Sequence, residues 1–179
     1  MRLPAGSTAS REVLGNFSFS TYWSNARGAC VAGPLVGSFR VLRPITQTQV
    51  GATTTIGFTW LTPHRWRDLR TITLELRDGR RAGAAVRFTN DGSATGQLAF
   101  GGQTGTPGQH RVLGSGPVSL VLGSSRVVGS GATGKTVAIT IALRFGRKLA
   151  RHALSVQIGA TDNQGTQEPF RPAGAIAIR

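Results

Sequence analysis

Beyond residue 38, apolar and polar residues alternate along most of the chain. Between residues 136 and 145, every second position is Val, Ile, Leu or Phe, and most positions between them are small or polar. A period of two residues is typical of a strand with one face buried. Alternation of this kind, or a short apolar run between turn residues, predicts strands at 39–42, 53–60, 70–77, 84–89, 96–100, 118–122, 137–145, 154–160 and 175–178.

Turn-forming residues separate these segments at the spacing of a β-sandwich. Asp78-Gly79 and Asn90-Asp91-Gly92 predict hairpin turns, and residues 101–116 are a Gly-rich connection without an apolar face, which predicts a surface loop. No window has the period of a helix, so we expect an all-β fold. The core is predicted to contain Ile56, Phe58, Ile72, Leu74, Val86, Phe88, Ile139, Ile141, Val156 and Ile158.

Residues 1–36 precede the alternating pattern and are interpreted as an N-terminal extension to a domain at 37–179. The extension carries an aromatic cluster of Phe17, Phe19, Tyr22 and Trp23, in which Phe17 and Phe19 would share one face of a strand. Such a segment can add a strand to its own domain or to the sheet edge of a neighbour. We therefore expect these four aromatic residues to mediate subunit assembly.

The last third of the chain resembles a known family. A strand at 137–145, a second at 154–160, the A-x-D-x-x-G element at 160–165 and a closing strand at 174–178 are similar to the end of bacterial immunoglobulin-like modules from secreted and cell-surface proteins. The resemblance implies an immunoglobulin-like antiparallel β-sandwich of about seven to nine strands. The chain departs from the family in being strongly basic and in having few acids.

Residues 129–136 match the phosphate-binding string G-x-x-x-x-G-K-[ST]. A nucleotide site of this type needs a helix immediately after the loop, because the helix N-terminus helps to hold the phosphates. The alternating pattern that begins at Thr136 instead predicts a strand. We therefore interpret the string as a Gly-rich turn, with positive φ angles at Gly131 and Gly134.

The charge balance is the clearest feature of the composition. The chain of 179 residues has 21 Lys and Arg against 7 Asp and Glu, a formal net charge of +14, and only Lys135 and Lys148 are lysines. One interpretation is a surface that binds polyanions; the other is a set of scattered, solvated arginines. In both cases we expect some affinity for polyanions at low salt.

Several kinds of reactive site are disfavoured, so we predict no metal, no cofactor and no enzymatic activity. Cys30 is the single cysteine, which rules out an internal disulfide and a four-Cys zinc site. His64, His110 and His152 each neighbour an arginine and are predicted to lie on the surface. Asp162 is interpreted as a turn residue that accepts backbone N–H groups rather than as a calcium ligand.

The candidate binding surface is basic and partly aromatic. Arg65, Trp66 and Arg67 follow Pro63 in a predicted loop, where an indole and two guanidinium groups could stack on bases or sugars and contact phosphates. The alternative is that Trp66 covers one end of the sandwich. A second basic loop would join the first in one patch if both lay at the same end; it contains Arg147, Lys148 and Arg151.

Two functions are consistent with these features. The resemblance implies a non-enzymatic structural or interaction module of a bacterial extracellular or cell-surface assembly, such as a filament, adhesin or accessory subunit, with protein partners in a homo- or hetero-oligomer. The alternative is a module that binds nucleic acid or an anionic polysaccharide through the Arg/Trp patch. A third interpretation is a carbohydrate-binding module centred on Trp66. The expected location is extracellular, although the sequence shows neither a signal peptide nor a membrane span of ~18 apolar residues.

Overall fold

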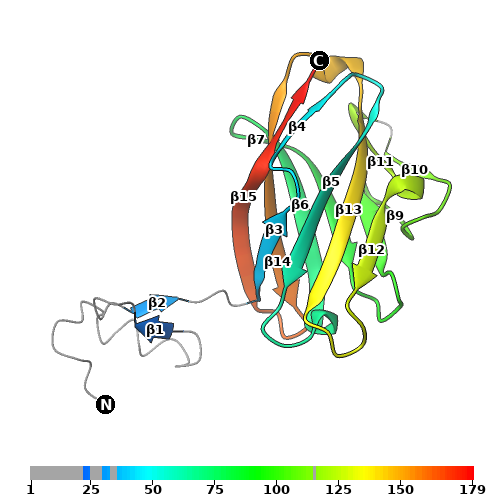
Figure 1. Ribbon diagram of the computed structural model, residues 1–179. Coiled ribbons are helices and arrows are strands. Elements are labelled where there is room, and N and C mark those ends of the chain that lie inside the picture. Colours follow the sequence, from blue (N-terminus) through cyan, green and yellow to red (C-terminus); the bar gives the residue numbers. More distant parts are fainter. Residues whose placement is uncertain (1–21, 25–29, 33–35, 115) are drawn as a thin grey trace. The chain divides into compact units, whose positions relative to one another are not determined.

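The computed structural model describes residues 22–24, 30–32, 36–114 and 116–179 (Figure 1). The chain divides into two units, residues 1–35 and 36–179, so the second unit begins one residue before the predicted boundary. In the first unit, β1 (Tyr22–Ser24) and β2 (Cys30–Ala32) form an antiparallel pair. The second unit is a two-sheet sandwich. Within the described segments, no helix has the length and apolar character that crossing a membrane requires.

The first sheet of the sandwich has β13 and β5 at its centre. Its path runs β10–β11–β13–β5–β3, and β12 also pairs with β13, beyond the end of β11. A one-residue slip would turn the apolar set of β5 or β13 to solvent, so the alternating pattern fixes the register. The strands are β3 (Ser38–Val41), β5 (Thr53–Leu61), β10 (Val112–Leu113), β11 (Val118–Val121), β12 (Arg126–Gly129) and β13 (Thr136–Phe145).

The second sheet packs against the first and runs in the order β4–β15–β14–β6–β7–β8–β9. Short 3-10 helices connect some of the strands: η2 (Trp66–Asp68), η3 (Leu122–Ser124) and η4 (Arg147–Leu149). The strands of this sheet are β4 (Ile45–Thr48), β6 (Leu69–Asp78), β7 (Arg81–Thr89), β8 (Gln97–Phe100), β9 (Gln103–Gly105), β14 (Ala153–Asp162) and β15 (Gln167–Ile178).

The connectivity is that of an immunoglobulin-like sandwich. The chain enters in β3 at the edge of the first sheet, crosses at Pro44, and continues as β4 at the edge of the second sheet. There β4 runs parallel to β15, with Ile45 opposite Ala175, while the other strand pairs are antiparallel. Two sheets of mostly antiparallel strands packed face to face, here of six and seven strands, are the architecture of immunoglobulin-like domains. The predicted fold class is therefore confirmed.

The core lies between the two sheets and contains all ten residues predicted for it, each no more than 5% exposed. Trp60, from β5, is fully buried among them, and its indole N–H donates to the carbonyl of Val36 at 3.4 Å. This bond satisfies the one polar atom of the ring, as burial of a tryptophan requires. Val36 thereby ties the start of the domain to its core.

One edge of the first sheet is interrupted where η3 separates β11 from β12. Ser125 follows η3 and is completely buried. Its hydroxyl donates to the carbonyl of Val121 at 2.8 Å and accepts the N–H of Ala142 at 3.0 Å. A single side chain thus replaces the missing rung of the strand ladder, because buried backbone groups need partners.

The nine predicted strands are present, but the chain has four more in the sandwich: β4, β9, β10 and β12. Each has only two to four residues with at most two apolar side chains, too few for a periodic pattern to be recognised. The expectation that residues 101–116 lack an apolar face is wrong, because Leu113 in β10 is fully buried.

Candidate functional site

The phosphate-binding string at residues 129–136 forms the turn between β12 and β13, and no helix follows it. The N–H of Ser130 donates to the carbonyl of Thr136 at 2.9 Å, and the Ser130 hydroxyl accepts the N–H of Thr136 at 3.0 Å. Gly131 has the expected positive φ, at 97°. Gly134 does not, and this part of the prediction is wrong: a side chain at Gly134 would overlap Ser130.

This turn is the socket for Trp66. The indole lies against Gly129, where any Cβ atom would overlap the ring. Its Nε1–H donates to the carbonyl of Gly131 at 2.7 Å, and the Trp66 backbone N–H donates to the carbonyl of Gly134 at 2.9 Å. The side chain is only 2% exposed. The prediction that Trp66 offers a stacking platform is therefore wrong, and the alternative, that it covers one end of the sandwich, is confirmed.

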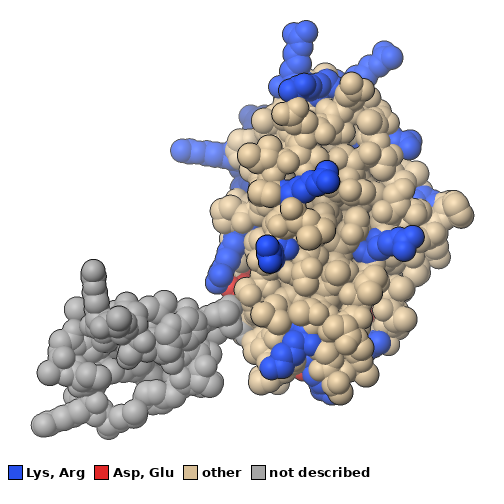
Figure 2. Space-filling view, in the orientation of Figure 1, with Lys and Arg blue, Asp and Glu red and all other residues tan. Residues whose placement is uncertain are grey.

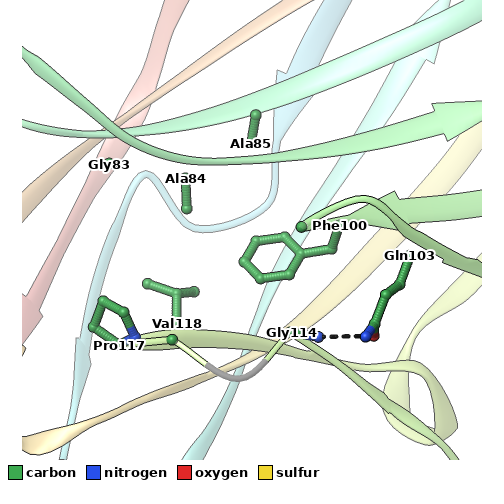
Figure 3. Close-up of a pocket in the computed structure, with 10 residues that line it drawn as sticks. Gly83, Ala84, Ala85, Phe100, Gln103, Gly114, Pro117 and Val118 are labelled. Carbon is green, nitrogen blue, oxygen red and sulfur yellow. Dashed lines mark hydrogen bonds between the residues drawn. The ribbon is translucent and has the colours of Figure 1, made fainter.

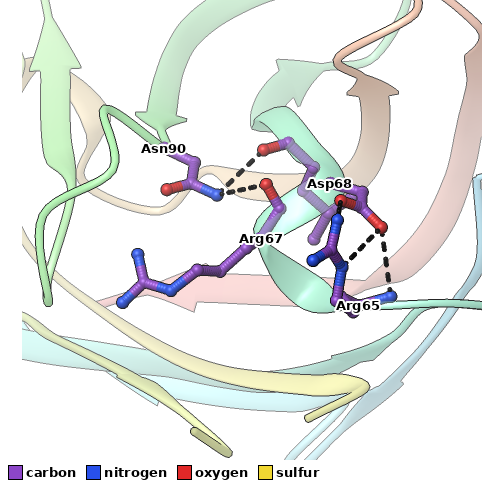
Figure 4. Close-up of polar contacts among 5 residues, drawn as sticks. Arg65, Arg67, Asp68 and Asn90 are labelled. Carbon is purple, nitrogen blue, oxygen red and sulfur yellow. Dashed lines mark hydrogen bonds and ion pairs between the residues drawn. The ribbon is translucent and has the colours of Figure 1, made fainter. Parts of the chain in front are cut away.

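The guanidinium groups of Arg65 and Arg67 make contacts within the domain, and Figure 4 shows those of Arg65 with Asp68. Arg65 pairs with Asp68 at 2.9 Å between Nη2 and Oδ1. Arg67 lies over the Trp66 ring, 4.6 Å from its centroid, and donates to the carbonyls of Gly92 and Ser93 at 2.9 and 3.1 Å. Two cations that sequence reasoning assigned to a ligand thus hold neighbouring loops.

The two basic loops lie at opposite ends of the sandwich, so the predicted single patch does not exist. Along β5 and β13, Leu61 is opposite Thr136 and Thr53 is opposite Arg144. The connection that contains η2 is therefore at one end, with the turns at 130–135 and 163–166. The connection that contains η4 is at the other end, with the turns at 49–52 and 79–80. We call these the η2 end and the η4 end.

The η4 end collects exposed cations from several connections. Figure 2 shows blue side chains standing out from this end, at the top of the view, with no red beside them on that face. Among the described residues, none of its Lys or Arg side chains is in an ion pair with a carboxylate. Its one acid in these connections, Asp78, bonds to Nδ1 of His152 at 2.7 Å. The exposed cations are Arg80, Arg81, Arg144, Arg147, Lys148, Arg151 and Arg179.

Arg151 has an unusual backbone. Its φ is +66°, and it is the one non-glycine residue with positive φ among the described residues. Its N–H donates to the carbonyl of Ile178 at 2.9 Å, which holds the turn against β15. Glycine would occupy this conformation at lower cost, and the chain uses glycine at its other positive-φ positions. An arginine kept in a strained conformation on a basic surface is the kind of outlier that accompanies function.

Carboxylates gather instead at the η2 end, where each has a local structural partner. Hydrogen bonds from the side chain and backbone of Ser93 hold the pKa of Asp91 below its usual range. Glu168 is buried, pairs with Arg171 and accepts the N–H of Val36 at 3.3 Å. Asp162 and Asp68 complete the group.

Asp162 has the role that the sequence predicted. Its Oδ1 accepts the N–H of Gln164 at 2.9 Å and the N–H of Thr166 at 2.7 Å. These bonds close the turn between β14 and β15, as an aspartate in such a turn commonly does. The interpretation of Asp162 as a turn residue is therefore confirmed. His64, His110 and His152 are all exposed, also as predicted.

A hollow of about 360 Å³ opens between β7 and the start of β11 (Figure 3). Phe100 and Val118 form its apolar floor, and the Gln103 side chain accepts the N–H of Gly114 at 3.2 Å. The lining contains no titratable side chain. The described residues that line this hollow therefore include no acid or base.

Two of the four aromatic residues assigned to assembly, Phe17 and Phe19, lie outside the described residues. Tyr22 and Trp23 are described only as backbone in β1, where they are opposite Ala32 and Val31 of β2. Their role in assembly stays a prediction.

Comparisons with known proteins give structural likeness only. No protein-family model and no curated protein matches the chain. A chain from a structure on T cell specificity and activation by the bacterial superantigen toxic shock syndrome toxin-1 matches 80% of this chain and 99% of its own length, at 11% identity and a TM-score of 0.40. Murine CRIg matches 80% of this chain and 98% of its own length, at 13% identity and a TM-score of 0.34. Astrotactin-2, a vertebrate-specific perforin-like membrane protein, matches 90% of this chain and 24% of its own length, at 12% identity and a TM-score of 0.35. These similarities are too low to carry a functional argument.

Proposed function

We propose that this protein is a non-enzymatic binding module that holds an anionic polymer at its η4 end. The observation that supports the proposal most is the separation of charge along the sandwich: the η4 end is rich in exposed arginine without carboxylate partners, whereas four of the acids lie at the η2 end. A surface of one charge sign raises the local concentration of an oppositely charged ligand and speeds its association. The site differs from the predicted patch by excluding Arg65, Trp66 and Arg67.

The chemistry of the surface indicates what it recognises. Nearly all its cations are arginines, whose planar guanidinium groups bind phosphate, sulfate or carboxylate through two parallel hydrogen bonds. Among the described residues, the connections at the η4 end contain no large, exposed aromatic side chain. Stacking on bases or sugar rings is therefore not part of the proposed recognition, which reads charge density rather than sequence.

Dextran sulfate and uncharged dextran test the proposal, because they share a backbone and differ in charge. We expect the protein to bind dextran sulfate and not uncharged dextran. The logarithm of the binding constant should fall steeply and linearly with the logarithm of the salt concentration. A net charge of +14 would by itself give some binding, so a matched control is needed. The variant R147A/K148A/R151A removes three charges from the η4 end, and R40A/R87A/R126A removes three exposed charges from three separate strands.

The first triple variant should weaken binding on the order of 100-fold at low salt, and the scattered variant no more than about fivefold. Equal losses would mean that the protein attracts polyanions only through its net charge. That result, or a failure of the wild type to bind dextran sulfate at low salt, would overturn the proposal.

A second function, assembly into a bacterial extracellular or cell-surface structure, is supported by one separate observation. Leu42 and Ile45 are 72% and 75% exposed and flank the point where the chain crosses between sheets, beside the edge strands β3 and β4. Exposed apolar side chains at a sheet edge are suited to contact with another subunit. The double substitution Leu42→Ser and Ile45→Ser, which removes these apolar side chains, should lower the oligomer size measured by light scattering. A monomer before and after the substitution would exclude this function.

A further inference from the structure

We infer that the η4 end contains a defined seat for one tetrahedral oxyanion, a phosphate or sulfate group, between Arg144 and Arg147. The inference rests on the proposed function and makes it more specific, because it names the group of the polymer that is recognised and the residues that hold it. It separates a general attraction, to which every surface cation contributes, from a local contact of fixed geometry.

The seat is a hollow of about 390 Å³ where β13 ends beside the β4–β5 turn. Two glycines of the lining border open space, because an added Cβ at Gly51 or Gly116 would meet no atom within 4 Å. The lining includes two arginines and one serine, and it has no acidic residue. An anion entering it therefore meets donors without a competing carboxylate. The lining residues are Val50, Gly51, Gly116, Ser119, Arg144, Phe145, Gly146 and Arg147.

Arg144 is placed by the strand register. It is opposite Thr53 in β5 and opposite Ser119 in β11, so the three side chains form one row across the outer face of the sheet. Directly opposite residues of antiparallel strands have Cβ atoms about 4.5–5.5 Å apart. The Arg144 guanidinium donates to the Thr53 hydroxyl at 3.4 Å, which orients the side chain and uses one of its five N–H groups. The others are available to a ligand, and Ser119 adds a further donor.

Arg147 approaches the same hollow from the following turn. The N–H of Gly146 donates to the carbonyl of Pro117 at 2.7 Å, and the N–H of Ala150 donates to the carbonyl of Arg147 at 3.1 Å. These bonds fix the backbone from which Arg147 projects. Two guanidinium groups on fixed supports can each donate two hydrogen bonds to a tetrahedral oxyanion. The hollow is larger than one such group requires, which leaves space for the chain that carries it.

Exchange of arginine for lysine tests the seat without changing the net charge. The variant R144K/R147K keeps the general attraction but loses the paired guanidinium hydrogen bonds. We expect about a tenfold loss of affinity for dextran sulfate at moderate salt, because lysine cannot replace the paired hydrogen bonds. The control R40K/R126K makes the same exchange at two exposed positions of β3 and β12 and should stay within about twofold of the wild type.

Inorganic sulfate provides a readout that needs no polymer. At constant ionic strength, sulfate should shift the amide NMR signals of Gly51, Gly116 and Gly146 in the wild type, and chloride should not. Inorganic phosphate, tested in parallel, shows which oxyanion fits better. Gly116→Leu adds a large side chain to the lining at a position where an added Cβ meets no atom within 4 Å, so it should fold normally and reduce these shifts.

The outcomes separate the seat from the proposed function. If sulfate shifts no signal at the hollow, or if R144K/R147K and its control bind dextran sulfate equally, the seat does not exist, although the polymer can still bind. If sulfate occupies the hollow but dextran sulfate does not bind, the proposed function is wrong and the seat stands.

Discussion

The two ends of the sandwich carry similar side chains and use them differently. At the η2 end, Arg65 is paired with Asp68, and Arg67 lies over Trp66 and donates to two carbonyls. At the η4 end, Arg147 and Arg151 are exposed and have no carboxylate partner among the described residues. A cation whose hydrogen bonds are already made stabilises the fold, whereas one without partners is free to bind a ligand.

The difference follows from what surrounds each loop. The η2 connection includes an aromatic side chain, which needs a socket and brings the neighbouring cations into contact with the domain. The η4 connection is Gly146-Arg147-Lys148-Leu149-Ala150-Arg151, which has no large aromatic side chain to bury. The number of basic residues in a loop therefore predicts binding poorly; the partners that these residues already have are the better guide.

The largest expected effect is on ligand affinity. R147A/R151A and R65A/R67A remove two arginines each, from the η4 and η2 ends. We expect the first to weaken dextran sulfate binding by about tenfold or more at low salt, and the second by no more than about threefold. Fluorescence anisotropy of the labelled polymer measures both. The reverse order would place the ligand at the η2 end.

Added side-chain atoms should destabilise the fold more at the Trp66 socket than at the open hollow beside Gly116. Gly129→Val places a side chain into the Trp66 ring and should reduce the free energy of unfolding by about 2–3 kcal/mol. Gly116→Ala adds a methyl group in open space and should change it by no more than about 0.5 kcal/mol. Urea denaturation gives both values, and a stable Gly129→Val variant would mean that the indole is not seated as described.

The contrast between the ends should also appear in stability. Arg67→Ala loses the contact with the Trp66 ring and two hydrogen bonds, a cost of about 1–2 kcal/mol after allowance for its partial exposure. Arg147→Ala loses no hydrogen bond made by its side chain and should stay within about 0.5 kcal/mol of the wild type. Equal destabilisation by the two substitutions would remove the distinction between a structural and a ligand-binding arginine.

Arg151→Gly should separate stability from binding at one position. Glycine relieves the positive φ but is more flexible in the unfolded chain, so stability should be unchanged or rise by up to about 1 kcal/mol. Affinity for dextran sulfate should fall by about threefold, because one charge is lost. Thermal denaturation and anisotropy on the same sample test the pair of effects, and loss of stability would show that the side chain supports the fold.

The smallest expected effect is a dependence of stability on pH at the η2 end. The Ser93 hydrogen bonds lower the pKa of Asp91 in the folded state, so the folded protein favours the ionised carboxylate. Its contribution is complete above the unfolded pKa of about 3.9 and is lost as the pH falls through the lower, folded pKa. Asp91→Asn should therefore flatten the acid side of the stability profile. An unchanged acid limb would contradict this role.

The sequence predicted the sandwich because its long strands repeat a two-residue pattern, and the core positions Phe58, Leu74 and Ile139 follow directly from it. The pattern after Thr136 also excluded a phosphate-binding loop. The sequence left open whether Trp66 binds a ligand or covers the end of the sandwich, because its burial depends on Gly129, which is distant in sequence and lacks a Cβ atom. No local pattern records such a contact. The opposite placement of the two basic loops could have been found by counting strands, since successive connections of antiparallel strands lie at opposite ends.

A protection experiment tests the central claim most directly. Phenylglyoxal modifies accessible arginines, and mass spectrometry measures modification at each one with and without dextran sulfate. We predict that the polymer protects Arg80, Arg81, Arg147 and Arg151 and leaves Arg40 and Arg126 as reactive as before. Protection centred on Arg65 and Arg67, or spread evenly over all exposed arginines, would contradict a binding site at the η4 end.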